Sequence, residues 1–505
     1  MTSGKATIHR LATGVGGLDE VLGGGLPEFS FNILAGPPGS GKTTLAHQLM
    51  FGLATAERPA LYFTVLGEPP LKMLRYMQQF AFFNSAAVNH SVHFINLADD
   101  AATGDLNQVL SKIVAAVERY APAFVFVDSF RSVMLASEAS NHSYVGLQKF
   151  VQQLGMLMTS WQATTFLLGE YFTDADPNPV FTVADGLIFL RQSALRNSVV
   201  RKLEIVKMRG QATLPGMHTF RIGAAGVSVF PPAQNTSHPP APTAAARASR
   251  LGMGVARLDD LMGGGLPRGY SLLVAGPSGS GKTILASAFL SEGARCGETG
   301  IIAAFEQRPT LARGRAVQEL IAAGKINVVE TRSANLSVDE MSMVLITEIR
   351  RTGATRIVID SLSGFELALA PTFQEDFREA LARMVPALTS AGATVLMTSE
   401  LEDRYDDLRF SPYGTAFLTD AIIVQRYIEV DSRLQRVMAV VKVRGSAHSN
   451  ELRLFQIDDT GICIGEMLAD HEGLLGGRPT RRAPTLPVDT DSAPAMQQGL
   501  RRMKP

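Results

Sequence analysis

Two segments of the chain match the phosphate-binding pattern G-x-x-x-x-G-K-[ST] and carry its clearest chemistry. Glycines let the backbone turn tightly, so that N–H groups at the start of a helix point at phosphate oxygens. The lysine brings a positive charge to the terminal phosphates, and the following hydroxyl is a ligand for Mg²⁺. We predict that each segment binds a nucleoside triphosphate. The two segments are Gly36, Pro37, Pro38, Gly39, Ser40, Gly41, Lys42, Thr43 and Thr44, and Gly276, Pro277, Ser278, Gly279, Ser280, Gly281, Lys282, Thr283 and Ile284.

The sequence around each glycine-rich segment favours a strand before it and a helix after it. Residues 31–35 and 271–275 are short, mostly apolar runs, as expected of buried parallel strands. The residues that follow Lys42 and Lys282 begin amphipathic helix patterns. Because the motif requires this strand-loop-helix setting, a chance match of both segments is a poor explanation.

Two aspartates end apolar runs further along the chain. Asp128 follows residues 124–127, and Asp360 follows residues 356–359. A carboxylate at this point of a phosphate-loop domain holds Mg²⁺ through its water shell, whereas the alternative is an aspartate that caps a loop. We predict that the metal ligands are Thr43, Asp128, Thr283 and Asp360.

The whole domain is repeated. The pattern G-V-x-x-L-D followed by GGGLP begins at Gly14 and again at Gly254, and the pattern V-K-x-R-G begins at Val206 and again at Val441. Between the copies lies a stretch rich in Pro, Ala, Ser and Thr, and the end of the chain is rich in Pro, Gly, Thr and Arg. We predict a first domain at 1–230, a linker at 231–250, a second domain at 251–469 and a disordered tail at 470–505.

Strand and helix patterns alternate within each copy. In the second copy, strands are expected at 271–275, 300–304, 327–330, 356–360 and 394–398, and helices at 311–322, 338–351 and 375–388. Such alternation is typical of an α/β fold with a mainly parallel sheet and helices on both faces. Strand patterns without helices between them follow at 421–429, 435–442 and 452–457, which predicts an antiparallel C-terminal extension.

Composition narrows the class of protein and the compartment in which we expect it. The 505 residues contain 47 Lys and Arg and 47 Asp and Glu, so a protein that coats nucleic acid is not favoured. No stretch approaches the roughly 20 apolar residues of a membrane span, and residues 1–10 lack the apolar segment of a signal peptide. Cys296 and Cys463 have no metal-ligand spacing. These features predict a cytoplasmic protein that does not contact a membrane.

The G-V-x-x-L-D and GGGLP patterns, the phosphate-binding segments, the strands ending in Asp-Ser and the late K-x-R-G pattern together resemble the KaiC family of RecA-like ATPases. The resemblance covers about residues 13–465. It implies two tandem RecA-like P-loop NTPase domains that use ATP and Mg²⁺. It also implies a homohexamer of two stacked rings, with nucleotide between neighbouring subunits and slow hydrolysis. In some members the second domain autophosphorylates.

By this resemblance, an acidic pair after the second strand polarises the attacking water or hydroxyl. In the second copy Glu306 matches the first acid, and Gln307 replaces the second, so Glu306 is the candidate general base. In the first copy Leu66 and Gly67 stand where the acids are expected, and Glu68 is displaced. Either Glu68 substitutes through a local shift, or the first site hydrolyses slowly and mainly holds ATP.

The late K-x-R pairs are the other catalytic candidates, namely Lys207 with Arg209 and Lys442 with Arg444. Alternate residues of a strand point to the same side, so each pair forms a positive prong. By resemblance, the prong reaches the phosphate bound in the adjacent subunit, like an arginine finger. The alternative is an exposed basic strand edge that limits aggregation.

Family members that autophosphorylate carry adjacent hydroxyl residues shortly before a Thr-Asp pair. Here Thr419-Asp420 is present, but Ala416-Phe417 stands at the acceptor positions. We therefore expect reduced or absent serine/threonine autokinase activity, or phosphorylation at a shifted residue. The nearby hydroxyls are Ser411, Thr415 and Thr419.

Three function classes fit the sequence. The first is a KaiC-like signalling ATPase whose nucleotide state changes the binding of protein partners. The second is a RecA-like or helicase-like DNA-dependent ATPase, which needs a basic, often aromatic, strand-binding surface; we find no such cluster in either copy. The third is a scaffold whose subunits are joined by ATP with little turnover. We favour the first and do not expect nucleic acid as a partner.

Overall fold

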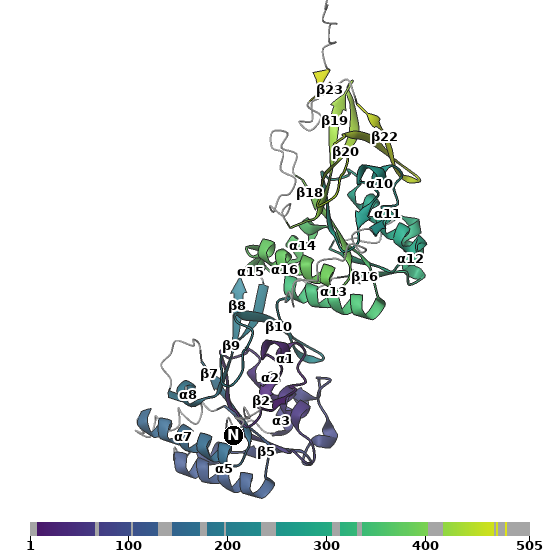
Figure 1. The fold of residues 1–505 in the computed structure, drawn as a ribbon. Helices are drawn as coiled ribbons and strands as arrows, with labels where there is room; N and C mark the ends of the chain where they lie inside the picture. The colour runs from purple at the N-terminus through teal and green to yellow at the C-terminus, as the bar shows by residue number, and fades with distance from the viewer. Residues whose placement is uncertain are drawn as a thin grey trace, which may run out of the picture.

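We describe the 505-residue protein from a computed structural model. The structure describes residues 8–65, 70–102, 105–129, 144–171, 179–195, 198–233, 249–305, 314–330, 336–401, 418–468, 471–472 and 480–481. Within these ranges each copy of the repeat forms one nine-stranded sheet, and the two copies lie end to end (Figure 1). Most of the linker predicted at 231–250 and of the tail predicted at 470–505 lies outside the described residues.

The first sheet has the strand order β11-β10-β9-β8-β3-β7-β6-β4-β5. The six strands β5, β4, β6, β7, β3 and β8 pair in parallel in that order, and β9, β10 and β11 extend the β8 edge in antiparallel fashion. Its strands are β3 (Phe31–Gly36), β4 (Ala60–Thr64), β5 (Val92–Asn96), β6 (Phe124–Asp128), β7 (Thr164–Glu170), β8 (Gly186–Leu195), β9 (Ser198–Met208), β10 (Met217–Gly223) and β11 (Gly226–Phe230).

The second sheet repeats this topology with the order β16-β15-β17-β18-β14-β19-β20-β21-β22. Its strands are β14 (Ser271–Gly276), β15 (Gly300–Ala304), β16 (Ile326–Glu330), β17 (Arg356–Asp360), β18 (Thr394–Glu400), β19 (Ala421–Val430), β20 (Arg433–Val443), β21 (Arg453–Asp458) and β22 (Gly461–Met467). The predicted fold class is confirmed: each copy is an α/β domain of RecA-like type with a mainly parallel sheet and an antiparallel extension.

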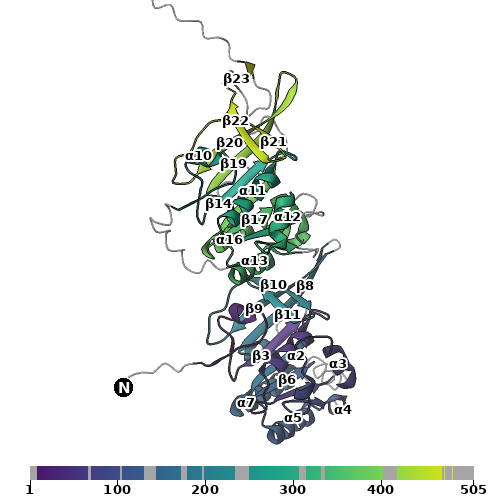
Figure 2. The same ribbon diagram turned by 90° about the vertical axis from the view of Figure 1, so that its right-hand side faces the viewer.

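Helices cover both faces of each sheet (Figure 2). Alternate strand residues enter different cores: Ile33 packs into one apolar cluster and its neighbour Leu34 into the other. This burial on both faces explains why the central strands read as continuous apolar runs. The longer helices are α2 (Lys42–Leu53), α3 (Pro70–Met77), α5 (Leu106–Tyr120), α7 (Tyr144–Ser160), α11 (Lys282–Arg295), α12 (Arg315–Ala322), α13 (Val338–Thr352), α14 (Leu362–Ala368) and α16 (Phe377–Ser390). None of the helices in the described ranges is long and apolar enough to cross a membrane.

The repeated G-V-x-x-L-D and GGGLP patterns have a structural role. The backbone carbonyl of Asp19 accepts hydrogen bonds from the N–H groups of Gly24 and Gly25, at 2.7 and 3.3 Å. Gly25 has a φ of 116°, and a Cβ there would lie 2.5 Å from the carbonyl oxygen of Leu11. Asp259 accepts the equivalent bonds from Gly264 and Gly265. The motif therefore fixes a tight glycine turn at the start of each domain.

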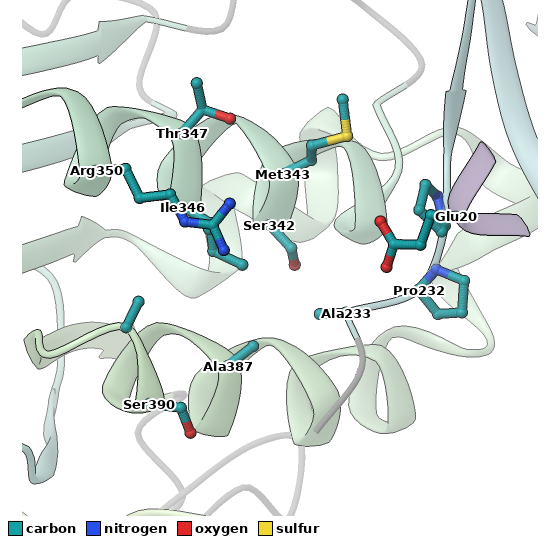
Figure 3. A pocket seen from close by; sticks show the side chains of 12 residues that line it. Glu20, Pro232, Ala233, Ser342, Met343, Ile346, Thr347, Arg350, Ala387 and Ser390 are labelled. Carbon is teal, nitrogen blue, oxygen red and sulfur yellow. The ribbon is translucent and has the colours of Figure 1, made fainter. Parts of the chain in front are cut away.

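The two copies meet where α13 of the second packs on the antiparallel strands of the first (Figure 2). Arg221 on β10 forms an ion pair with Glu340 on α13, with 2.6 Å between Nε and Oε1. The neighbouring residue Ile222 contacts the first glycine-rich loop. A hollow of about 270 Å³ lies at this junction between α13, α16 and residues 231–233, with Glu20 and Arg350 at opposite ends (Figure 3). Adjacent residues of β10 therefore contact the first glycine-rich loop, through Ile222, and the second domain, through Arg221.

A buried arginine anchors the strand that ends in Asp360. Arg356 is 1% exposed, and its guanidinium pairs with Glu298 at 2.6 Å and donates to the carbonyls of Gly252 and Phe289, both at 2.8 Å. We expect Arg356→Ala to destabilise the protein by about 3–5 kcal/mol, because it removes a buried guanidinium, leaves two carbonyls without their donor and leaves Glu298 with Arg268 as its remaining arginine partner. Denaturant unfolding should show this loss, whereas Arg351→Ala, which removes an exposed pair with Glu348, should cost less than about 1 kcal/mol. Equal stability of the two variants would contradict the prediction.

Candidate functional site

The first glycine-rich loop joins β3 to α2, as predicted from the sequence. Gly41 has a φ of 103° at the start of α2, and a Cβ there would lie 2.7 Å from Ile222. The ammonium of Lys42 is buried and donates to the carbonyls of Gly36 and Pro37, both at 2.9 Å. Burial lowers the pKa of Lys42, while the carboxylates of Glu170 and Asp128 oppose this shift. The loop therefore wraps around the ammonium of Lys42, which also lines the cavity beside the loop.

The second loop, between β14 and α11, has the same geometry. Gly281 has a φ of 103°, and Lys282 donates to the carbonyls of Gly276 and Pro277 at 2.9 and 2.7 Å. The two predicted loops therefore have the same geometry, although their sequences differ at two positions, Pro38 against Ser278 and Thr44 against Ile284.

Each loop lies beside the aspartate that the sequence singled out. The hydroxyl of Thr43 donates to Asp128 Oδ2 at 2.9 Å, and that of Thr283 donates to Asp360 Oδ2 at 2.9 Å. Mg²⁺ prefers oxygen ligands and usually takes one or two from the protein and the rest from phosphate and water. Within the described residues no group of three or more His, Cys, Asp or Glu side chains could hold a metal alone. This hydroxyl–carboxylate pair therefore fits a Mg²⁺ ion that arrives with a triphosphate.

A cavity opens in front of each loop. The first has a volume of about 350 Å³ and is lined by the loop, Thr64, Asp128, Ser129, Glu170 and Ile222. The second has a volume of about 220 Å³ and is lined by its loop, Asp360, Ser361 and Glu400. The peptide bonds Asp128–Ser129 and Asp360–Ser361 are both cis. The two copies therefore present equivalent cavities at the carboxyl ends of their parallel strands, where ligands of open α/β sheets bind.

Sequence reasoning missed one carboxylate in each cavity. Glu170 ends β7 and Glu400 ends β18, next to the strand that leads into the glycine loop. The signal was present in the repeat, because both copies place a glutamate after an apolar strand of the same length. Glu68 and Glu306 lie outside the described residues, as does Gln307.

The carboxylate of Asp128 is partly buried at the wall of the cavity, and this burial raises its pKa. The hydroxyls of Tyr62 and Thr43 partly offset this by donating to the ionised form. His47 packs against the Tyr62 ring with 4.8 Å between centroids, and burial lowers the pKa of His47 to about 3. The imidazole is therefore neutral at physiological pH and adds no positive charge that would compete with a metal.

Comparison with known proteins agrees with this geometry. The family model described as an ATPase of the KaiC type matches residues 11–234 and again residues 251–469. The chain belongs to the KaiC ATPase family. Proteins called circadian clock oscillator protein KaiC are similar over nearly the whole chain. Those from Rippkaea orientalis and Synechococcus elongatus are 27% identical, over 94% of this chain and 92% of their own. That from Picosynechococcus is 28% identical, over 94% and 93%.

In this KaiC-family chain, the basic K-x-R pairs do not line the cavity of their own domain. Lys207 donates to the carbonyls of Phe181 and Thr182 at 3.2 and 3.1 Å, and Arg209 pairs with Asp185 at 3.3 Å. Both basic side chains thus contact one segment of their own domain.

The second pair repeats this arrangement. Lys442 donates to the carbonyl of Thr419 at 2.5 Å, and Arg444 pairs with Asp420 at 3.1 Å. Asp420 also accepts a hydrogen bond from the N–H of Ser271 at the start of β14. Thr419 and Asp420 are therefore part of the support of the central strand. Ser411, Thr415, Ala416 and Phe417 lie outside the described residues.

Proposed function

We propose that this KaiC-family chain is a signalling ATPase that binds and slowly hydrolyses ATP at two sites between subunits of a hexameric double ring. Domains 1–230 and 251–469, joined by the linker 231–250, would each form one ring. One observation carries the proposal. In each domain the glycine loop, its lysine and the hydroxyl–carboxylate pair lie together at one cavity, while the K-x-R pair of the same domain lies outside that cavity. We expect the K-x-R pair of a neighbouring subunit to supply a second cation to the phosphates there.

The residues of each site have separate roles in binding phosphate, holding the metal and activating water. Backbone N–H groups of each loop, with Lys42 or Lys282, bind and orient the phosphates. Thr43 with Asp128, and Thr283 with Asp360, would hold Mg²⁺, which neutralises charge on the phosphates when it is bound. Glu306 would take the proton of the attacking water in the second site.

The acid in the first site is less defined. Glu68 is the candidate from the sequence, and Glu170 is a carboxylate that lines the cavity. Either can orient water there, which leaves open a first site that mainly holds ATP. Different rates at the two sites would suit a protein whose nucleotide state is read by a protein partner.

The transferred phosphoryl group should go to water and not to the protein. Ala416 and Phe417 offer no hydroxyl acceptor. We therefore expect release of inorganic phosphate from ATP labelled on the γ-phosphate, with reduced or absent covalent label. Phosphate release and peptide mapping after incubation with Mg²⁺ check this. Strong labelling between Ser411 and Thr419 would contradict the absence of autokinase activity, and absence of both release and nucleotide uptake would contradict the proposed function itself.

A further inference from the structure

The two sites hold their metal-side aspartates with hydroxyl groups from different strands. In the first copy the phenol of Tyr62, on β4, donates to Asp128 Oδ2 at 2.7 Å. In the second copy the hydroxyl of Thr398, on β18, donates to Asp360 Oδ1. These bonds are additional to those from the threonines of the two glycine loops. Each carboxylate therefore receives two hydroxyl donors, one of which comes from a neighbouring strand.

The register shows that the two donors occupy positions that are not equivalent. Tyr62 and Ile302 each lie two residues before the residue that pairs with the aspartate. Thr398 and Leu168 each lie two residues before the glutamate that ends their strand. The aspartate strand is flanked on both sides in both copies. Each copy thus places a hydroxyl on one flank and an aliphatic side chain on the other, and the two copies use opposite flanks.

Packing alone does not account for the tyrosine hydroxyl. Tyr62 is fully buried, and its ring stacks on Phe126 at 6.0 Å between centroids. A buried hydroxyl costs free energy unless it is hydrogen-bonded, and an aliphatic residue at this position serves the second copy. The bond to Asp128 is what makes a tyrosine favourable here.

We propose that Tyr62 is a positioning residue of the first site: its hydrogen bond fixes the orientation of Asp128 and so raises the affinity of this site for Mg²⁺. Thr398 has the same role toward Asp360 in the second site. This inference rests on the proposed function, since it concerns the metal that accompanies ATP. Outer-shell partners of metal-binding carboxylates typically change metal affinity about 10- to 100-fold.

The test measures metal binding and not turnover. With Lys282→Ala removing the second site, Mn²⁺ binding in the presence of a non-hydrolysable ATP analogue is followed by electron paramagnetic resonance. We expect Tyr62→Phe to lower Mn²⁺ affinity about 10-fold, while nucleotide binding in chelator stays unchanged. Adding Leu168→Thr supplies a hydroxyl from the flank that the second copy uses, and should restore most of the affinity.

A matched experiment examines the second site. With Lys42→Ala removing the first site, Thr398→Val should lower Mn²⁺ affinity to a similar degree, because it removes the hydroxyl that donates to Asp360. The valine side chain has nearly the same shape as threonine, so packing should change little. Unchanged Mn²⁺ affinity in Tyr62→Phe or in Thr398→Val would overturn the inference and leave the proposed function intact. Absence of any metal-dependent nucleotide uptake with Tyr62 and Thr398 intact would overturn both.

Discussion

Replacing Lys42 or Lys282 by alanine is expected to halve the amount of ATP bound per chain. Each ammonium is buried at its loop and is the cation nearest to where the phosphates would lie. Charge-assisted hydrogen bonds of this kind contribute about 1.5–3 kcal/mol each, so the loss of affinity should reach on the order of 100-fold at the altered site. Equilibrium binding of fluorescent ATP to each single variant and to the double variant measures it.

Matched controls separate the phosphate role from a general effect of charge. Lys112 on α5 and Lys325 between α12 and β16 are exposed and lie outside the two nucleotide cavities. Alanine at either position should leave stoichiometry and affinity unchanged. Full binding by the Lys42→Ala, Lys282→Ala double variant would show that the glycine loops are not the nucleotide sites.

The second large effect is expected from Arg209→Ala and Arg444→Ala. If these side chains reach the phosphates of an adjacent subunit, their loss should lower hydrolysis by about 1000-fold or more, while ATP still binds to the intact loops. Their ion pairs with Asp185 and Asp420 are largely exposed, so the fold should lose less than about 1 kcal/mol. Arg433→Ala, at an exposed residue of β20, should hydrolyse ATP at the normal rate.

Mixing subunits tests whether the arginine acts across an interface. Chains with Lys42→Ala and Lys282→Ala keep both arginines but lack working loops, and chains with Arg209→Ala and Arg444→Ala have the reverse defect. Each should be inactive alone, and co-assembled rings should regain part of the hydrolysis. No recovery on mixing, despite shared rings, would mean that the arginine works within its own chain or not at all.

Local sequence predicted the framework of both sites because the relevant signals are short-range. The strand runs before each glycine loop, the loop itself and the aspartate at the end of β6 or β17 follow from apolar patterning and motif spacing. Because the sequence repeats, the topology expected of one copy was expected of the other as well. Helix bounds were predicted less accurately. The helix expected at 375–388 is α16, which begins and ends two residues later.

The missing parts depend on register and long-range contact. The bond from Tyr62 to Asp128 joins residues 66 apart in sequence, and it exists only because β4 pairs with β6. Glu170 enters the first cavity because β7 lies beside β3. Arg356 begins a buried strand where composition alone favours an apolar residue, and its partners come from three other segments. None of these contacts leaves a periodic pattern or a motif in the sequence by which it could be predicted.

Sedimentation of the purified chain with and without ATP and Mg²⁺, with bound nucleotide counted in the same sample, tests the central claim most directly. We predict hexamers that depend on ATP and carry two nucleotides per chain. A chain that stays monomeric in ATP and Mg²⁺ and retains no nucleotide would contradict the account.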